Sequence, residues 1–225
     1  MKAGDISRLK KAMLSRMTAL LKEIGFSRWA RYQHFFRPGP NDTTQGVYLC
    51  TIPHPMVDFD VVTHFSVRYN AIAEILNKWP EAPGEPSSVR ATLGTDYPRL
   101  IGVGDYRWKI ARDEDVEPAA RAILEAITTV GFEFYSRFTT LADLICLLQT
   151  ERDWWTYCLE IGPAMALPVA LALAGRQSEV EAACRRGYEV IKGQPALRLH
   201  AERYPTFVKY ISKVLDLPLR LGGEG

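Results

Sequence analysis

The sequence predicts an α+β fold in which an antiparallel sheet of about five strands is flanked by helices and followed by an all-helical C-terminal half. Three observations lead to this prediction: an amphipathic helix opens the chain, strand-like alternation and turn residues follow it, and helical periodicity dominates from Asp113 onward. Helices that gather after the strands favour α+β over a parallel βαβ sheet. The predicted regions are a sheet region, 1–112, and a helical region, 113–225, packed on it as one compact unit.

The first helix and the first three strands follow from residue spacing. Apolar side chains recur at helical spacing from residue 6 to residue 24, and Gly25 supplies a C-terminal stop. Residues 26–37 are rich in aromatic side chains, residues 46–54 are β-branched and apolar, and the turn residues 38–42 between them predict an antiparallel hairpin. Residues 58–68 alternate between apolar and polar side chains, which indicates a strand with one buried face.

The next elements are shorter. Asn70 is expected to cap a helix that Pro80 ends, and residues 80–88, rich in proline, glycine and serine, are expected to form a surface loop. Residues 89–95 and 106–110 predict two further strands. In the second of these, Tyr106 is expected to point inward together with Trp108 and Ile110.

The second half is predicted to be helical throughout. One helix runs from Val116 to Val130 and stops at Gly131, and another begins at Thr140 with Asp143 three residues on. A helix over 163–175 precedes one that starts with a capping box formed by Ser178 and Glu181. Pro205 is expected in the first turn of the last helix, where its missing N–H is tolerated.

Two sequence stretches carry a resemblance. Ile24-Gly25-Phe26 closes the basic first helix ahead of an aromatic hairpin, and Gly131-Phe132-Glu133-Phe134 leads to Phe138-Thr139-Thr140-Leu141-Ala142-Asp143-Leu144. This layout, over roughly residues 9–145, resembles a bacterial family of uncharacterised α+β proteins with a domain of unknown function. The resemblance implies the fold and a bacterial cytoplasmic setting, and it transfers no active site.

Composition excludes several classes of protein. Of 225 residues, 47% are hydrophobic and 24% charged, which is typical of a folded globular chain. No secretory signal is apparent, and the most apolar stretch, 161–175, is shorter than the roughly 20 residues that span a bilayer. The scattered Cys50, Cys146, Cys158 and Cys184 suggest buried, reduced thiols and no disulfide framework. We therefore expect a cytoplasmic protein with no membrane partner and no cofactor.

Charge is unevenly distributed along the chain. Residues 1–37 hold nine lysines and arginines against Asp5 and Glu23, so this segment carries +7 and the remainder −5. Within it, Arg28, Arg31 and Arg37 are interleaved with aromatic residues, a composition compatible with single-stranded nucleic acid. The same mixture describes a strand with a buried aromatic face and a wet basic face, and the near-neutral overall charge disfavours nucleic acid.

The best chemical candidates are His54, Asp58, Asp60 and His64. Asp60 and His64 are separated by about 13 Å at the rise of a strand, too far to bind one ion together. Asp58 and Asp60 could share an ion if another strand supplied a ligand. A solvated strand face is the alternative interpretation, and no metal site is predicted. No Gly-x-Ser-x-Gly or His-Glu-x-x-His motif is present.

The predicted function is therefore that of a non-enzymatic binding module, an immunity-type bacterial protein that blocks a toxin. Arg28, Arg31 and Arg37 would steer an acidic partner protein, and one of the neighbouring Trp154 and Trp155 would be exposed as a hot spot. One alternative is a hydrolase or metal-dependent enzyme that uses Asp58, Asp60 and His64. The other is nucleic-acid binding through the basic N-terminal region.

Overall fold

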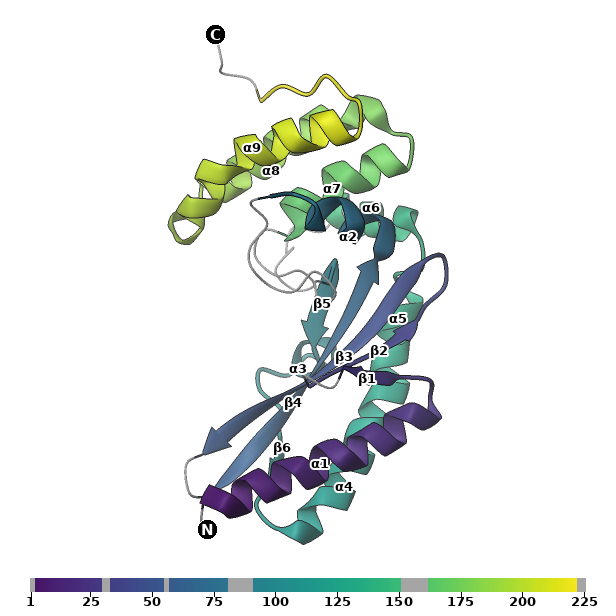
Figure 1. Cartoon of the computed structure of the whole chain (residues 1–225), viewed down its shortest axis with the longest axis vertical. Coiled ribbons are helices and arrows are strands. Elements are labelled where there is room, and N and C mark those ends of the chain that lie inside the picture. Colours follow the sequence, from purple (N-terminus) through teal and green to yellow (C-terminus); the bar gives the residue numbers. More distant parts are fainter. Residues whose placement is uncertain (1–2, 30–32, 55–56, 81–90, 151–161, 222–225) are drawn as a thin grey trace. The chain divides into compact units, whose positions relative to one another are not determined.

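The computed structural model describes residues 3–29, 33–54, 57–80, 91–150 and 162–221 (Figure 1). The strands are β1 (Ser27–Trp29), β2 (His34–Pro38), β3 (Thr43–His54), β4 (Asp58–Tyr69), β5 (Leu93–Asp96) and β6 (Trp108–Ile110). The α-helices are α1 (Ala3–Glu23), α2 (Asn70–Asn77), α3 (Tyr97–Leu100), α4 (Asp113–Ala126), α5 (Phe132–Ser136), α6 (Leu141–Thr150), α7 (Gly162–Leu173), α8 (Gln177–Lys192) and α9 (Arg198–Val214). A π-helical turn, η1 (Ile127–Gly131), joins α4 to α5, and a 3₁₀ turn, η3 (Pro195–Leu197), precedes α9. The predicted α+β fold, with its helical C-terminal half, is confirmed.

Within the described ranges, the strands form one six-stranded sheet in the order β1-β2-β3-β4-β5, with β6 also paired to β4. The hairpin predicted around residues 38–42 is present, since β2 and β3 are antiparallel with Phe35 opposite Val47. Its turn places Asn41 and Asp42 at φ of 51° and 57°, a left-handed conformation that these two residue types tolerate better than most. Along β4, buried and half-buried residues alternate from Val61 to Tyr69, as the sequence pattern predicted.

The chain forms two compact units that are interleaved in sequence. Unit 1 comprises 1–39, 44–67 and 94–137, and unit 2 comprises 40–43, 68–93 and 138–225. The boundary in the second half therefore falls after Arg137, whereas the sequence analysis placed it after residue 112. The reason is that α4 lies alongside α1 within unit 1 (Figure 1). Two ion pairs link these helices, Arg8 to Asp113 at 2.6 Å and Arg16 to Glu117 at 2.5 Å.

Each unit has its own apolar core. In unit 1, the buried side of the sheet and of α1, α4 and α5 contributes the largest buried side chains, which include Phe26, Phe35, Phe59, Phe65 and Tyr135. In unit 2, the helices α2 and α6–α9 contribute the core, where Trp79 packs edge-on against Phe207 with ring centroids 5.5 Å apart. Burial of this aromatic and aliphatic area is the main contribution to the stability of each unit.

Several predicted helix boundaries are wrong. Gly131 does not end a helix, because its φ of −65° is helical and the chain continues through η1 into α5. Pro205 lies inside α9 and not in its first turn, because that helix begins earlier, directly after η3. Ser178 does not cap α8, which starts at Gln177, and the guanidinium of Arg176 binds the Glu179 carboxylate at 2.6 Å.

Three smaller predictions about individual side chains are also wrong. Asn70 is the first residue of α2 and not its cap, and its side-chain amide donates to Asp42 at 3.0 Å. Tyr106 is exposed, although Trp108 and Ile110 are buried as expected. Among the cysteines, Cys184 is buried, Cys50 is half-buried and Cys146 is exposed, and all three are free thiols. Cys158 lies outside the described residues.

Candidate functional site

One side of the sheet in unit 1 carries polar and aromatic residues that are half-exposed. On β4 the buried Phe59, Val61 and Phe65 alternate with the half-buried Asp60 and His64. Because side chains alternate between the two faces of a strand, the half-buried set lies opposite the apolar core. We call this side the outer face, and we define it by Trp29, His34, Phe36, Tyr48, His54, Asp58, Asp60, His64, Arg107 and Lys109.

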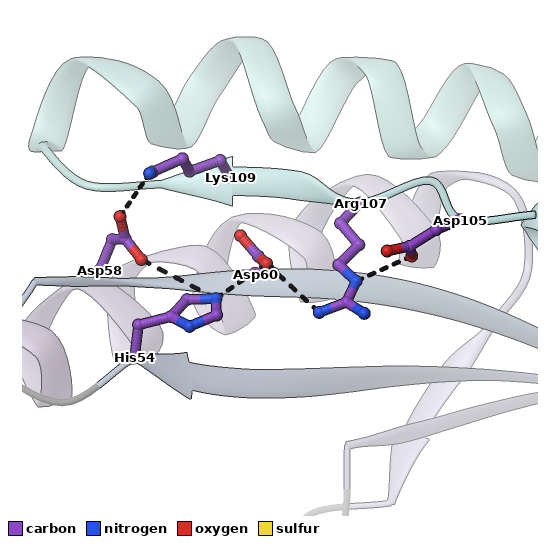
Figure 2. A network of polar contacts seen from close by, with 6 residues as sticks. All are labelled: His54, Asp58, Asp60, Asp105, Arg107 and Lys109. Atoms are coloured by element: carbon purple, nitrogen blue, oxygen red, sulfur yellow. Dashed lines mark hydrogen bonds and ion pairs between the residues drawn. The ribbon is translucent and has the colours of Figure 1, made fainter.

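A cluster of charged side chains occupies one part of the outer face, at the β3–β4 hairpin (Figure 2). His54 ends β3, while Asp58 and Asp60 lie at the start of β4. The Nε2 atom of His54 lies 2.9 Å from Oδ2 of Asp60 and 3.9 Å from Oδ1 of Asp58. Two strands therefore bring an imidazole against two carboxylates, and we call these three residues the His-Asp-Asp cluster.

Strand β6 adds basic side chains to the cluster. The antiparallel pairing of β4 with β6 sets Asp60 opposite Lys109, so Lys109 and Arg107 share the outer face with the two aspartates. Nζ of Lys109 lies 2.7 Å from Oδ2 of Asp58, and Arg107 lies 3.7 Å from Asp60. Arg107 also donates from Nε to Asp105 at 2.8 Å, and Figure 2 shows the chain of contacts running from Lys109 to Asp105.

Burial differs strongly among these partners. The Asp58 side chain is only 3% exposed, whereas that of Lys109 is 67% exposed and that of His54 is 41% exposed. A buried carboxylate needs a cation nearby, and Lys109 supplies it. The hydrogen bond to Asp58, and then the charge of that residue, raises the pKa of Lys109 above its usual range. The positive charge of Lys109 is therefore secured at neutral pH.

The His-Asp-Asp cluster has the composition of a metal site. One imidazole nitrogen and one oxygen from each carboxylate all lie within 4.8 Å of one another, so an ion placed among them could touch all three. Imidazole and carboxylate are common ligands of first-row transition metals. Among the described residues, this is the one group of His, Cys, Asp and Glu side chains with such convergence.

His64, which the sequence analysis grouped with Asp58 and Asp60, lies in different surroundings. Its ring packs against Tyr48 with centroids 5.6 Å apart. Burial lowers the pKa of His64, and the smaller effects of Asp96 and Arg99 oppose each other. His64 is therefore neutral at pH 7 and belongs to an aromatic row. The side chain from another strand that approaches both aspartates is His54.

The aromatic row crosses four neighbouring strands of the outer face. From β1 to β4, successive ring centroids lie 6.5 Å apart for Trp29 and Phe36, 5.9 Å for Phe36 and His34, 4.4 Å for His34 and Tyr48, and 5.6 Å for Tyr48 and His64. Such cross-strand ring pairs stabilise a sheet. They also place aromatic surface on the same face of the sheet as the charged cluster, with Tyr48 the most exposed aromatic residue of the described strands at 36%.

The arginines predicted to steer a partner differ in their surroundings. Arg28 is exposed on β1, and Arg31 lies outside the described residues. Arg37 is not available for steering, because its guanidinium packs over Phe26 and Phe132 and donates to the Gln45 side chain at 2.7 Å. Trp154 and Trp155, the predicted hot-spot pair, also lie outside the described residues.

The basic excess of the N-terminal segment is partly balanced inside unit 1. Arg8 and Arg16 of α1 bind Asp113 and Glu117 at the start of α4. In the folded unit, the excess positive charge of the N-terminal segment is therefore smaller than the sequence values of +7 and −5 indicated. This balance was hidden from the sequence because α1 and α4 are about a hundred residues apart in the chain.

A shallow hollow of about 540 Å³ lies elsewhere, between α8 and α9 in unit 2, with Tyr188, Lys192 and Arg198 among its lining residues. Nζ of Lys192 lies 5.8 Å from the centroid of the Tyr188 ring, where a cation is attracted to the ring face. Arg198 is bound to Glu202 at 3.0 Å. Since the cations of the hollow already have partners, the outer face is the stronger candidate.

Comparisons with known proteins give no family. A scan against protein-family models, a search of curated proteins and a search of solved structures each found no match to this chain. The resemblance to a bacterial family of unknown function therefore stays a prediction. None of the described helices is long and apolar enough to cross a membrane.

Proposed function

We propose that this chain is a non-enzymatic binding module that engages a partner protein through its outer face, as an immunity-type bacterial protein that blocks a toxin. The supporting observation is the aromatic row from Trp29 to His64, which shares the outer face of the sheet with a charged cluster. Protein interfaces typically combine aromatic anchors at the centre with a polar, charged rim.

The partner expected from this chemistry is a globular protein with an apolar, weakly charged patch. Burial lowers the pKa of His64, so this ring of the row is neutral at pH 7, and the charged cluster already pairs its acids with Lys109 and Arg107. With Arg37 packed among rings, long-range steering of an acidic partner has little support. The association rate should therefore depend weakly on salt concentration, and high affinity should come from slow dissociation.

The mechanism would be steric blockade, in which the sheet covers the working surface of the toxin. Tyr48 is the best anchor to test, because it lies in the middle of the row and its ring is among the exposed ones. Truncation of a central aromatic anchor typically costs about 2 kcal/mol or more of binding free energy, while rim residues cost little.

The experiment captures partners from native bacterial lysate with three matched baits. The wild type is compared with the double variant His34→Ala/Tyr48→Ala and with Leu199→Ala, a control at a side chain of α9 that is 65% exposed. We expect one stoichiometric partner with the wild type and the control and none with the double variant. The captured protein should arrest growth when it is expressed alone, and co-expression of the wild type should restore growth.

Two results would count against the proposal in different ways. A partner that the double variant retains as well as the wild type does would remove the outer face as the binding surface. A captured protein that is harmless when expressed alone would remove the immunity role. Thermal unfolding of all three baits checks that loss of the partner does not come from loss of the fold.

A further inference from the structure

We propose that the His-Asp-Asp cluster binds one divalent first-row transition-metal ion, held by Nε2 of His54 and one oxygen from each of Asp58 and Asp60. These three atoms converge within 4.8 Å. They come from both strands of one hairpin, so a folded sheet is needed to assemble them. This inference is independent of the proposed partner binding, because the ion can be measured on the isolated protein.

The spacing of the ligand atoms suits such an ion. Zinc–nitrogen and zinc–oxygen bonds are about 2.0–2.2 Å long, so neighbouring ligands of one ion lie about 3–4 Å apart. Nε2 of His54 lies 2.9 Å from the nearer Asp60 oxygen and 3.9 Å from the nearer Asp58 oxygen. An ion could therefore replace the contact between His54 and Asp60 with small side-chain movements and no change of backbone.

One neighbouring cation, Lys109, orients the Asp58 carboxylate of the cluster. Lys109 holds Oδ2 of Asp58 at 2.7 Å, while Oδ1 of the same carboxylate faces His54. Partners of this kind, outside the ligands themselves, orient metal ligands in many sites. Lys109 and Arg107 also oppose a cation electrostatically, so we expect a modest affinity in the micromolar range.

The ligand set selects among metals. Magnesium and calcium prefer oxygen ligands throughout, whereas an imidazole favours zinc, cobalt and nickel. Three protein ligands leave coordination positions for water, and the partial exposure of His54 gives access from solvent. Zinc and cobalt are therefore the expected ions, and magnesium at the same concentration should not compete with them.

The experiment titrates the full-length protein, freed of any polyhistidine tag, with cobalt and zinc chloride at neutral pH. Calorimetry gives the stoichiometry, and the visible absorption of cobalt reports on its ligands. We expect one ion per chain. Loss of a residue that only supports a metal ligand typically weakens binding about tenfold, so His54→Ala, which removes a ligand, should weaken it at least as much. His64→Ala, a histidine on the same face but outside the cluster, should leave binding unchanged.

A variant that removes a positive charge distinguishes this site from nonspecific binding of metal to an exposed histidine. Removal of a cation a few ångströms from a divalent ion should increase the affinity about tenfold, so Lys109→Gln is expected to bind cobalt more tightly than the wild type. If that variant does not fold, because Asp58 loses its partner, the two histidine variants still decide the matter. No micromolar binding by the wild type, or equal binding by His54→Ala, would overturn the proposal.

Discussion

The guanidinium carbon of Arg37 lies 4.1 Å from the centroid of the Phe132 ring and 4.8 Å from that of Phe26. Burial lowers the pKa of this arginine, but a guanidinium stays charged at any physiological pH. Its planar group can lie over rings and donate sideways to Gln45 and to the Ile24 carbonyl at the same time. Arg37 therefore links the end of α1 to the sheet and to α5.

Arg37→Lys should consequently lower the free energy of unfolding by about 1–3 kcal/mol, because an ammonium keeps the charge but loses the planar stacking and the paired donors. Urea unfolding followed by tryptophan fluorescence measures the change. The control is Arg28→Lys on the exposed strand β1, which should stay within about 0.5 kcal/mol of the wild type. Equal stability of Arg37→Lys and wild type would show that stacking contributes nothing here.

Gly131→Ala should destabilise the protein although alanine normally favours helices. A Cβ at this position would lie 2.7 Å from Cε1 of Phe65, a fully buried ring that also packs against Tyr135. Overpacking of this kind typically costs about 1–3 kcal/mol, more than the gain of about 1 kcal/mol in helix propensity. The free energy of unfolding is measured for Gly131→Ala and for the double variant Gly131→Ala/Phe65→Leu. The double variant should recover part of the stability that Gly131→Ala loses.

Gly104→Ala provides the matched control for that substitution. A Cβ added there meets no heavy atom within 4 Å, and the backbone is not in the left-handed region. We expect a change of no more than about 0.5 kcal/mol. Similar losses at both glycines would point to a general cost of the substitution and not to the ring of Phe65.

Tyr135→Phe should cost about 1–2 kcal/mol of stability. The buried hydroxyl donates to the Gly46 carbonyl at 2.7 Å, and its removal leaves that carbonyl without this donor. Burial also raises the pKa of Tyr135, so this phenol should not ionise with the exposed tyrosines in an alkaline absorbance titration. Tyr106→Phe, at an exposed ring, should leave stability unchanged, and an equal loss in both variants would contradict the argument.

Acid should weaken the contact between α1 and α4. The hydrogen bond from Arg16 lowers the pKa of Glu117 below its usual 4.5, and Arg8 does the same for Asp113. A carboxyl whose pKa is depressed by folding stabilises the protein above its unfolded pKa, and this stabilisation is lost as pH falls through the folded pKa. Stability should therefore decline below about pH 4.5, and Arg16→Gln should flatten the decline. An unchanged pH profile for that variant would exclude the ion pair as its source.

The thiols should differ in reactivity. Burial raises the pKa of Cys184 to about 12, whereas Cys146 is exposed on α6. Since the thiolate is the reactive form, a disulfide reagent at pH 8 should label Cys146 quickly in the native protein and Cys184 only after unfolding. Cys146→Ser should remove one fast-reacting thiol, and Cys184→Ser should remove none. Rapid native labelling of Cys184 would show that unit 2 opens readily.

The fold could be predicted wherever one local signal decided the structure. Gly25 ends α1 at a φ of +87°, which glycine alone adopts easily, and Asp143 accepts from the Thr140 amide at 2.7 Å at the start of α6. The signals failed where tertiary packing decided. Gly131 lies within a continuous helical segment, where its missing side chain leaves room for the Phe65 ring, and no local pattern records that packing.

The candidate site could be predicted only in part. Asp58 and Asp60 were grouped because they lie two residues apart on one face of a strand, and a shared ion would need a further ligand from another strand. The approach of His54 to both aspartates depends on how the β3–β4 hairpin closes. The pairing of Lys109 and Arg107 with these acids follows from the register of β6 on β4. Register of distant strands is a tertiary property.

The interleaving of the two units has a consequence for the order in which the chain can fold during synthesis. Unit 1 has all its residues once Arg137 has left the ribosome, whereas unit 2 begins at Pro40 and needs helices α6–α9. Until then Trp79 lacks the Phe207 ring of α9, against which it packs with centroids 5.5 Å apart. A messenger RNA truncated within the last third of its coding sequence would therefore yield a folded unit 1 joined to segments of unit 2 that lack their packing partners. Products of this kind aggregate or are degraded.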